Sequence, residues 1–213
     1  MSKYRILNTR VPRVDAVDKA SGKALYTDDL KRPGMLYAAI LHSPLAHARI
    51  LNIDTSRAER LPGVKAIVTH REAGITPYGV SPARYDETIF CHDKVRYVGD
   101  EIAAVAAVDH DTALEAANLI KADFEEMPAV LDGRMAMDDG QPQLHEMYEN
   151  NICARVHWHF GDIEEGRRQS HLVRTDRLTS KMQDAAFMEP QSVLAEVDSH
   201  GNLTMWSSTQ APH

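Results

Sequence analysis

The stretch Ile102-Ala103-Ala104-Val105-Ala106-Ala107-Val108 is uniformly apolar and is followed directly by a signal for the start of a helix. An apolar run without polar alternation is typical of a strand that is buried on both faces. Asp109 or Asp111 can then accept hydrogen bonds from the free amides of a helix N-terminus. That helix would carry one apolar stripe, formed by Ala113, Leu114, Ala117 and Ile120. The stretch therefore predicts a strand buried on both faces, followed by a capped helix with one apolar stripe.

Further strand patterns precede and follow this stretch in the sequence. Residues 35–41 are mostly apolar, and residues 48–54 alternate apolar and polar side chains like a half-buried strand. A short helix capped by Thr55 or Ser56 should end near Leu61, before the next strand. The remaining strand predictions are residues 64–69, 94–98 and 122–125. These patterns predict a self-contained α+β domain over residues 22–130, preceded by an N-terminal arm over residues 1–21.

The C-terminal third of the chain has a different composition. Residues 131–151 are polar and rich in turn residues, which predicts a surface linker. Beyond it, four strand patterns follow one another, the last two joined as a hairpin by His200-Gly201-Asn202. They cover residues 152–160, 172–180, 192–197 and 203–207. An isolated hairpin is only marginally stable in water, so residues 152–213 are predicted to be the incomplete, β-rich start of a domain that needs further chain or a partner.

The overall composition excludes several classes of function. The 213 residues carry a formal net charge of -7 with a pI near 5.9, so the chain lacks the basic surface expected for binding nucleic acid. No apolar run approaches the roughly 20 residues of a membrane-spanning helix, and the N-terminus lacks the apolar core of a signal peptide. We therefore expect a cytoplasmic protein with no membrane span.

The cysteines and paired histidines are weak candidates for a metal site. Cys91 and Cys153 are far apart and neither belongs to a CxxC motif, so we expect two buried, inert thiols. His157 and His159 would share one face of a strand, a spacing that can hold a metal. No acidic third ligand lies at a matching offset on that strand, which favours a structural role over a metal site.

Among the carboxylates, Glu189 is the candidate of most interest. It lies between Phe187-Met188 and Pro190, where an apolar environment would raise the pKa of its carboxyl group and mark a cleft. Pairing with a backbone amide or an arginine is an equally good interpretation. The adjacent pairs Glu125-Glu126 and Glu164-Glu165 are predicted to be solvated surface charge, and Asp162 to cap a helix. Local chemistry alone assigns no catalytic residue in this chain.

Several longer stretches of the sequence are together similar to those of a known protein family. From about Arg13 to its last residue, the chain resembles the molybdenum-binding subunit of the xanthine dehydrogenase and aldehyde oxidase family, the molybdenum hydroxylases. Residues 43–50 are similar to the family phrase Ser-Pro-His-Ala-His-Ala-Arg-Ile, with Leu45 in place of one histidine. The other phrases, in family order, are residues 13–29, 61–64 and 95–100 and the group Phe124, Met127 and Pro128.

The resemblance implies a fold and an activity. Residues up to about Pro128 would form the family's a/b hammerhead domain, and residues 187–190 and 208–212 would open its molybdopterin-binding region. The implied reaction is hydroxylation of an aldehyde or an N-heterocycle, with water as the source of oxygen. The implied cofactor is molybdopterin, with [2Fe-2S] clusters and FAD carried by partner subunits or domains.

The resemblance also implies that this chain does not complete the reaction alone. The family's Gly-rich pterin-binding phrase and its glutamate base lie downstream of the position equivalent to His213. Glu189 matches a family position but not that of the base, so it would line the substrate cavity or serve a structural role. We therefore expect an N-terminal portion or split subunit that acts with the remaining molybdenum-subunit chain and with iron-sulfur and FAD subunits. The alternative is a non-catalytic assembly module derived from the same family.

Overall fold

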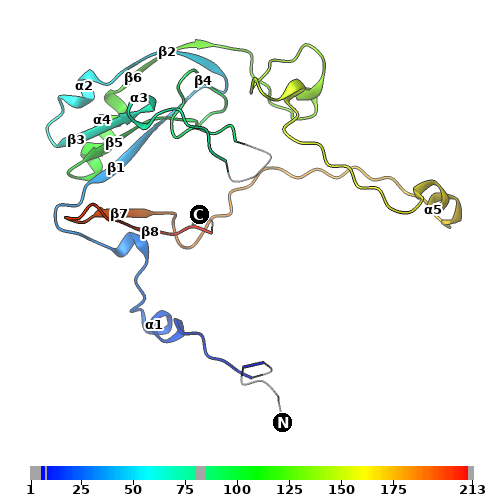
Figure 1. Cartoon of the computed structure of the whole chain (residues 1–213), viewed down its shortest axis with the longest axis horizontal. Coiled ribbons are helices and arrows are strands. Elements are labelled where there is room, and N and C mark those ends of the chain that lie inside the picture. Colours follow the sequence, from blue (N-terminus) through cyan, green and yellow to red (C-terminus); the bar gives the residue numbers. More distant parts are fainter. Residues whose placement is uncertain (1–5, 8, 80–84, 211–213) are drawn as a thin grey trace. The chain divides into compact units, whose positions relative to one another are not determined.

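The computed structural model describes residues 6–7, 9–79 and 85–210 (Figure 1). The chain divides into two compact units. One is the continuous segment Gly34–Ser170, and the other combines Met1–Pro33 with His171–His213. The last two residues of the phrase at 208–212 lie outside the described residues, as does the start of the N-terminal arm before Ile6.

The unit Gly34–Ser170 contains the strand predicted to be buried on both faces, and this strand is central in its sheet. This strand, β5 (Glu101–Ala107), lies between β1 (Tyr37–His42) and β3 (Val64–Thr69), and both pairings are antiparallel. Val105 is paired with Ala39 of β1 on one side and with Ile67 of β3 on the other. Ile102, Ala103, Val105 and Ala107 are buried, whereas Ala104 and Ala106, which share a face with Ile102, are partly buried. The burial predicted for both faces is therefore complete on one face and partial on the other.

A second sheet in this unit has β2 (Ala48–Asp54) at its centre. The strands β4 (Lys94–Val95) and β6 (Lys121–Glu126) pair with it in antiparallel fashion. His47, just before β2, is buried and its Nδ1 lies 2.7 Å from the carbonyl oxygen of Pro128, while the amide of Met127 donates to the carbonyl oxygen of His47. The start of β2 is thereby fixed to the chain leaving β6.

The main helix of the unit, α4 (His110–Leu119), packs against β1 and β5. Asp109 is its N-cap, because its carboxylate accepts a hydrogen bond of 2.7 Å from the amide of Thr112. The predicted stripe needs one correction: Ala116 is buried, whereas Leu114 is exposed. Positions 113, 116, 117 and 120 follow the helical repeat of 3.6 residues, and position 114 is rotated away from that face.

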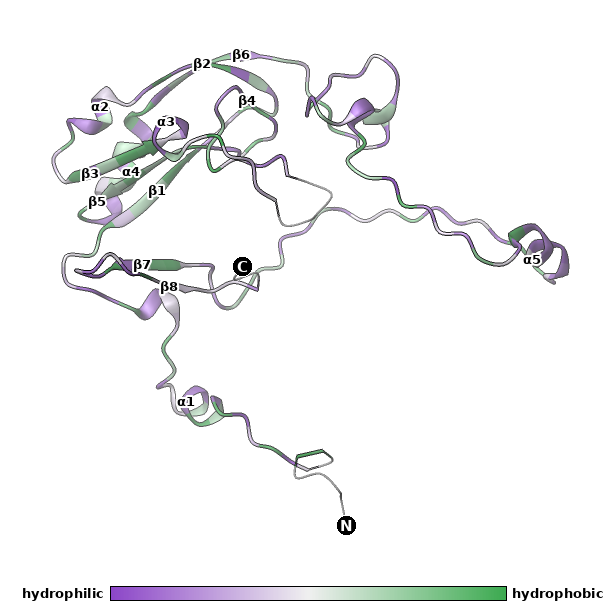
Figure 2. Cartoon of the chain, in the orientation of Figure 1, coloured by the Kyte–Doolittle hydropathy of each residue, from purple (hydrophilic) through white to green (hydrophobic). Residues whose placement is uncertain are grey.

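Two shorter helices lie close to the strands and to α4 in this unit, which is α+β as predicted. They are α2 (Ser56–Glu59), which contacts α4, and α3 (His70–Ala73), which contacts β3. Thr69 and Glu72 form a capping box at the start of α3. Figure 2 shows hydrophobic residues concentrated on the strands of this unit. The largest fully buried side chains there are Ile53, Ile102, His47, Val95 and Val105.

The segment after β6 is held by its own polar contacts. It contains two 3-10 turns, η2 (Met135–Met137) and η3 (Glu149–Asn151). The Asn151 side-chain amide donates hydrogen bonds of 3.0 Å to the carbonyl oxygens of Ala136 and Pro142, and its oxygen accepts one from the amide of Leu144. The segment predicted as a linker is therefore an ordered loop over most of its length.

Two of the four predicted C-terminal strands are wrong for this structure. Residues 152–160 and 172–180 contain no strand. A strand requires a hydrogen-bonded neighbour, and neither segment has one among the residues that the structure describes. Between them lies α5 (Ile163–Gln169), which Asp162 caps by accepting hydrogen bonds of 3.0 Å from the amides of Glu164 and Glu165.

The other unit is built around the predicted hairpin. Its strands β7 (Val193–Val197) and β8 (Leu203–Ser207) are antiparallel, with Ala195 opposite Met205. The unit also contains α1 (Ala16–Ser21) and η1 (Thr27–Asp29), and η1 contacts β7. Within the described ranges, no helix of either unit is long and apolar enough to cross a membrane.

Candidate functional site

The candidate site lies at the open end of the β7–β8 hairpin and depends on how the hairpin is built. At its closed end, the Asp198 carboxylate accepts hydrogen bonds from the Asn202 side chain and from the amides of Asn202 and His200, at 2.8–2.9 Å. These bonds lower the pKa of Asp198 below its ordinary value. Gly201 adopts a φ of +83°, which a residue with a side chain rarely adopts. The turn thus fixes the register of the two strands.

Ser208 fixes the open end. Its hydroxyl accepts a hydrogen bond of 2.7 Å from the amide of Ser192, and its own amide donates to the carbonyl oxygen of Ser192 at 3.1 Å. The same hydroxyl lies within donating distance of the carbonyl oxygens of Ser192 and Pro190, at 3.2 and 3.3 Å. The loop that carries Glu189 is therefore attached to the residues that follow β8.

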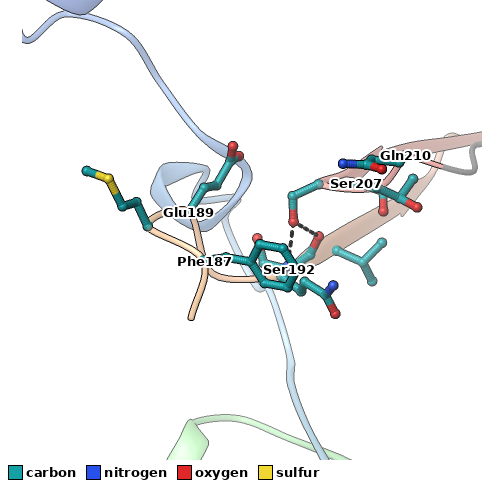
Figure 3. A pocket seen from close by; sticks show the side chains of 10 residues that line it. Phe187, Glu189, Ser192, Ser207 and Gln210 are labelled. Carbon is teal, nitrogen blue, oxygen red and sulfur yellow. Dashed lines mark hydrogen bonds between the residues drawn. The ribbon is translucent and has the colours of Figure 1, made fainter. Parts of the chain in front are cut away.

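An open hollow of about 1010 Å³ lies beside this attachment (Figure 3). Figure 3 shows Glu189 on the loop that precedes β7 and Gln210 on the chain that follows β8, with Phe187 and Ser192 lining the hollow between them. The Ser192 hydroxyl oxygen is buried and has no hydrogen-bond partner among the described residues. The wall of the hollow also carries the hydroxyl of Ser207, the side-chain amide of Gln210 and the carboxylate of Glu189. Its lining residues are Phe187, Met188, Glu189, Gln191, Ser192, Val193, Ser207, Ser208, Thr209 and Gln210.

A smaller hollow of about 410 Å³ lies in the same unit and shares Glu189 and Ser192 with the first. The segment around η1 forms its other wall, through Tyr26, Asp28 and Asp29. That segment is attached to the hairpin by Arg32, whose Nε donates a hydrogen bond of 3.1 Å to Glu196 and whose guanidinium lies 4.8 Å from the centre of the Trp206 ring. Residues far apart in the sequence thus line the hollow at whose edge Glu189 lies.

The structure corrects the expected surroundings of Glu189. Its side chain is exposed rather than enclosed by apolar groups. Phe187 and Met188 do not cover it, because both are exposed as well. Glu189 is therefore a solvated carboxylate at the edge of two hollows.

The other candidates do not form a site. His157 and His159 are exposed and lie on no strand, and no group of three or more metal-binding side chains occurs in the parts of the chain that the structure describes. Cys91 is buried, and burial together with a hydrogen bond to Asp100 raises the pKa of its thiol. Cys153 is exposed, contrary to prediction. The glutamate pairs are surface charge as predicted, and Glu125 pairs with Arg49.

A second polar cluster, which sequence reasoning missed, lies in the other unit. Lys94 of β4 has only 8% of its side chain exposed, and its Nζ lies 2.5 Å from Glu146 and 3.3 Å from the carbonyl oxygen of Gln143. Arg96 donates to the carbonyl oxygen of Leu144 at 2.9 Å and to Glu146 at 3.5 Å. Burial opposes ionisation of Glu146, but the bond to Lys94, a backbone hydrogen bond and the charges of Lys94 and Arg96 together outweigh it and lower the pKa of Glu146 to about 2. The cluster attaches residues 143–146 to β4.

A cavity of about 320 Å³ adjoins this cluster. Across it, His145 Nδ1 lies 3.2 Å from Asp86, and Tyr97 donates to Glu101 at 3.3 Å. Burial and the neighbouring charges of Asp100 and Glu101 raise the pKa of Tyr97 to about 12. These polar groups are paired with one another, so we interpret the cluster as a structural contact that holds residues 143–146 against β4. Nothing in the sequence indicated it, because its members come from three separate segments.

Comparison with known protein families identifies both parts of the chain. Residues 21–128 match the family described as "Aldehyde oxidase and xanthine dehydrogenase, a/b hammerhead domain". Residues 144–213 match the "Molybdopterin cofactor-binding domain". The fold is thus a hammerhead domain followed by the β-rich start of a molybdopterin-binding domain. The chain belongs to the aldehyde oxidase and xanthine dehydrogenase family of molybdenum hydroxylases.

Individual relatives support this assignment. The chain is 36% identical over 199 residues to a probable xanthine dehydrogenase subunit of Bacillus subtilis, with 93% of this chain and 26% of the relative covered. It is 33% identical over 211 residues to the nicotinate dehydrogenase large molybdopterin subunit of Eubacterium barkeri, with 99% and 49% covered. The chain therefore spans between about a quarter and a half of the length of these curated relatives.

Solved structures show the same fold. Quinoline 2-oxidoreductase from Pseudomonas putida 86 matches with a TM-score of 0.83 and 27% identity, over 96% of this chain and 27% of that chain. The reconstituted CO dehydrogenase from Oligotropha carboxidovorans matches with a TM-score of 0.81 and 31% identity, over 97% and 28%. In both solved proteins, most of the polypeptide has no counterpart in this chain.

Proposed function

We propose that this chain contributes the hammerhead domain and the first part of the molybdopterin-binding domain to a molybdenum hydroxylase. The enzyme would hydroxylate an aldehyde or an N-heterocycle with water as the source of oxygen. The matches of both domains, in order along one chain, carry this proposal. Because the chain covers only part of the length of its relatives, it would be inactive without the rest of the molybdenum subunit. Iron-sulfur and FAD subunits would complete the enzyme.

We assign one edge of such a cofactor to the hollow at the open end of the hairpin. The buried Ser192 hydroxyl has no partner among the described residues, and an unpaired buried polar group is costly unless a ligand or water satisfies it. The Gln210 amide can both donate and accept a hydrogen bond, and Ser192 and Gln210 line the same hollow. These residues would hold polar groups of the cofactor, and Glu189 would line the adjoining substrate cavity. When bound, the molybdenum cofactor supplies the two-electron oxidation that hydroxylation requires.

The test is purification of the tagged chain from its host, followed by measurement of native mass, molybdenum and pterin content, and dye reduction with a panel of aldehydes and N-heterocycles. We expect a large assembly that contains molybdenum and oxidises at least one compound of these classes. The double variant Ser192→Ala with Gln210→Ala should lower the molybdenum content. His200→Ala, in the turn at the other end of the hairpin, should leave it unchanged. A metal-free species with the mass of the chain alone would contradict the proposal and favour a non-catalytic module.

A further inference from the structure

Arg32 connects the segment after η1 to both strands of the hairpin. Its Nε donates a hydrogen bond of 3.1 Å to the Glu196 carboxylate of β7, and its guanidinium carbon lies 4.8 Å from the centre of the Trp206 ring of β8. A terminal nitrogen of the same group donates to the carbonyl oxygen of Lys31 at 3.2 Å. Because a guanidinium is planar, it can bind a carboxylate along its edge while its face lies over an aromatic ring. Arg32 is therefore directed by several contacts at once.

The register of the hairpin places both partners of Arg32 on one face. Leu194 is paired with Trp206, and Glu196 is paired with Thr204. Residues that lie directly opposite each other share a face, and every second residue along a strand returns to it. Among the described residues of β7 and β8, Leu194 and Trp206 are partly buried and the others are exposed. The partly buried face of the hairpin is thus the face that Arg32 contacts.

The segment that Arg32 attaches forms one wall of the hollow of about 410 Å³, across which Glu189 lies. Tyr26, Asp28 and Asp29 make up this part of the lining, here called the η1 wall. The wall has internal hydrogen bonds, because the amide of Tyr26 donates to the Asp29 carboxylate at 2.9 Å and the amide of Asp29 donates to the carbonyl oxygen of Tyr26 at 3.0 Å. It can therefore move as one piece, and Arg32, three residues beyond it, attaches that piece to the hairpin.

This attachment contributes more to position than to stability. The side chains of Arg32 and Glu196 are 36% and 50% exposed, and an ion pair so exposed to water adds little to the free energy of folding. The hydrogen bond and the ring contact still restrict where the segment lies, because both depend on the orientation of one guanidinium. Loss of Arg32 should therefore change the width of the hollow without unfolding the unit.

We propose that Arg32 is a positioning residue for the substrate: by binding Glu196 and Trp206, it holds the η1 wall across the hollow from Glu189. This inference rests on the proposed function, which supplies an aldehyde or an N-heterocycle as the ligand. It assigns a role to a side chain outside the set of described residues that line the hollow. A wall that is already in place binds its ligand more tightly, since the ligand does not have to order it.

Steady-state kinetics of the enzyme purified from the host test this role, with the compound that the dye-reduction panel identifies. Arg32→Gln should raise KM about tenfold and change kcat less than about twofold, because it removes binding without touching the reacting atoms. Lys23→Gln removes the same charge from an exposed residue of the same segment and should leave both constants unchanged. Native mass and molybdenum content should be the same in all variants.

Further substitutions determine whether Arg32 acts through the hairpin. Glu196→Gln removes the partner, so the double variant with Arg32→Gln should raise KM no further than Arg32→Gln alone. Arg32→Lys retains the charge but not the planar group, and should recover only part of the loss. In amide hydrogen exchange of the same enzymes, residues 27–32 should exchange faster in Arg32→Gln than in the wild type.

Four results would overturn the inference. If residues 27–32 exchange faster in Arg32→Gln while KM is unchanged, the η1 wall does not position the substrate, and the proposed function stands. If Arg32→Gln lowers the molybdenum content, the role of Arg32 is structural. If the effects of Arg32→Gln and Glu196→Gln on KM multiply, the two side chains do not act through their contact. If the wild-type assembly contains no molybdenum and oxidises no compound of the panel, both the inference and the proposed function fail.

Discussion

Asp109 shows how a single side chain defines an element boundary. Its carboxylate accepts a hydrogen bond from the amide of Thr112, whereas Asp111, two residues later, lies inside the helix. The sequence allowed either residue as the cap, because both are short acidic side chains near the start of the apolar stripe. Only the geometry of the chain leaving β5 distinguishes them, since the cap must have an extended backbone.

Asp109→Ala should destabilise the protein by about 1 kcal/mol, because the Thr112 amide loses its partner. Asp111→Ala is the matched control and should cost much less. The measurement is the free energy of unfolding from urea titration, monitored by circular dichroism. Equal losses in the two variants would show that capping by Asp109 does not stabilise α4.

The attachment between Lys94 and Glu146 is the second feature at the scale of residues. The pKa of Glu146 is about 2 in the folded chain, below its usual value of 4.5. A carboxyl group with a lowered folded pKa stabilises the protein above its unfolded pKa, and this contribution is lost as the pH falls through the folded value. The stabilisation should therefore be complete near neutrality and decline between about pH 5 and pH 2.

Glu146→Gln should reduce the loss of folding stability that accompanies a fall in pH below about 5. We expect the urea midpoint of the variant to be lower than that of the wild type at about pH 7. The difference should be smaller at about pH 3, where protonation has begun to remove the stabilisation that the ionised Glu146 carboxylate supplies. Glu149→Gln, in the same loop, is the control and should follow the wild-type profile. A variant profile parallel to the wild type at all pH values would contradict the role given to Glu146.

At the scale of elements, the connection from α2 to β3 depends on Gly63. Its φ is +98°, and a Cβ atom there would lie 2.9 Å from Val108 and 3.1 Å from Thr112. The Gly63 carbonyl oxygen also accepts a hydrogen bond of 3.0 Å from the amide of Val108. The turn therefore brings β3 close to the junction of β5 and α4, where a side chain would not fit.

Gly63→Ala should lower the free energy of unfolding of the hammerhead domain by about 1–3 kcal/mol, because backbone strain and a steric clash act together. Gly133→Ala is the matched control, since its added Cβ meets no atom within 4 Å and its φ is not positive. Thermal unfolding of both variants measures the difference. Similar midpoints for the two variants would mean that the turn adjusts without cost.

Elements were predictable where the local pattern and the tertiary environment agree. The predictions for residues 48–54 and 64–69 coincide with β2 and β3, and those for 192–197 and 203–207 closely match β7 and β8. The predictions for 152–160 and 172–180 were wrong because alternation of side chains shows only that a segment can form a strand. Strand formation also requires a neighbouring backbone, which the described chain does not provide there.

At the scale of the whole molecule, the two units differ in how much core they contain. The buried apolar cluster comes almost entirely from the unit Gly34–Ser170, whereas the residues of β7 and β8 are mostly exposed. A hairpin with little buried surface is marginal without further strands. The hammerhead domain should therefore fold by itself, and the rest of the chain should depend on its partner.

Limited proteolysis tests this difference. With trypsin, we expect early cleavage after Arg155, Arg174 and Arg177, and a resistant fragment that contains β1–β6 and ends beyond Asn151. Binding to the rest of the molybdenum subunit should slow the cleavage after Arg155. Early cleavage after Lys65 or Lys121, both in strands of the hammerhead domain, would contradict an independently stable domain.

The sequence by itself determined the class of fold, an apolar buried strand, the capped helix and the family, because these depend on local periodicity and on phrases of adjacent residues. It also singled out Glu189 in a segment that lines two hollows. Only the tertiary structure decided that Glu189 is solvated, that Ser208 fixes its loop, and that Lys94 and Glu146 pair across 52 residues of sequence. Such contacts join side chains from distant segments, and their formation depends on chain geometry that no local pattern encodes.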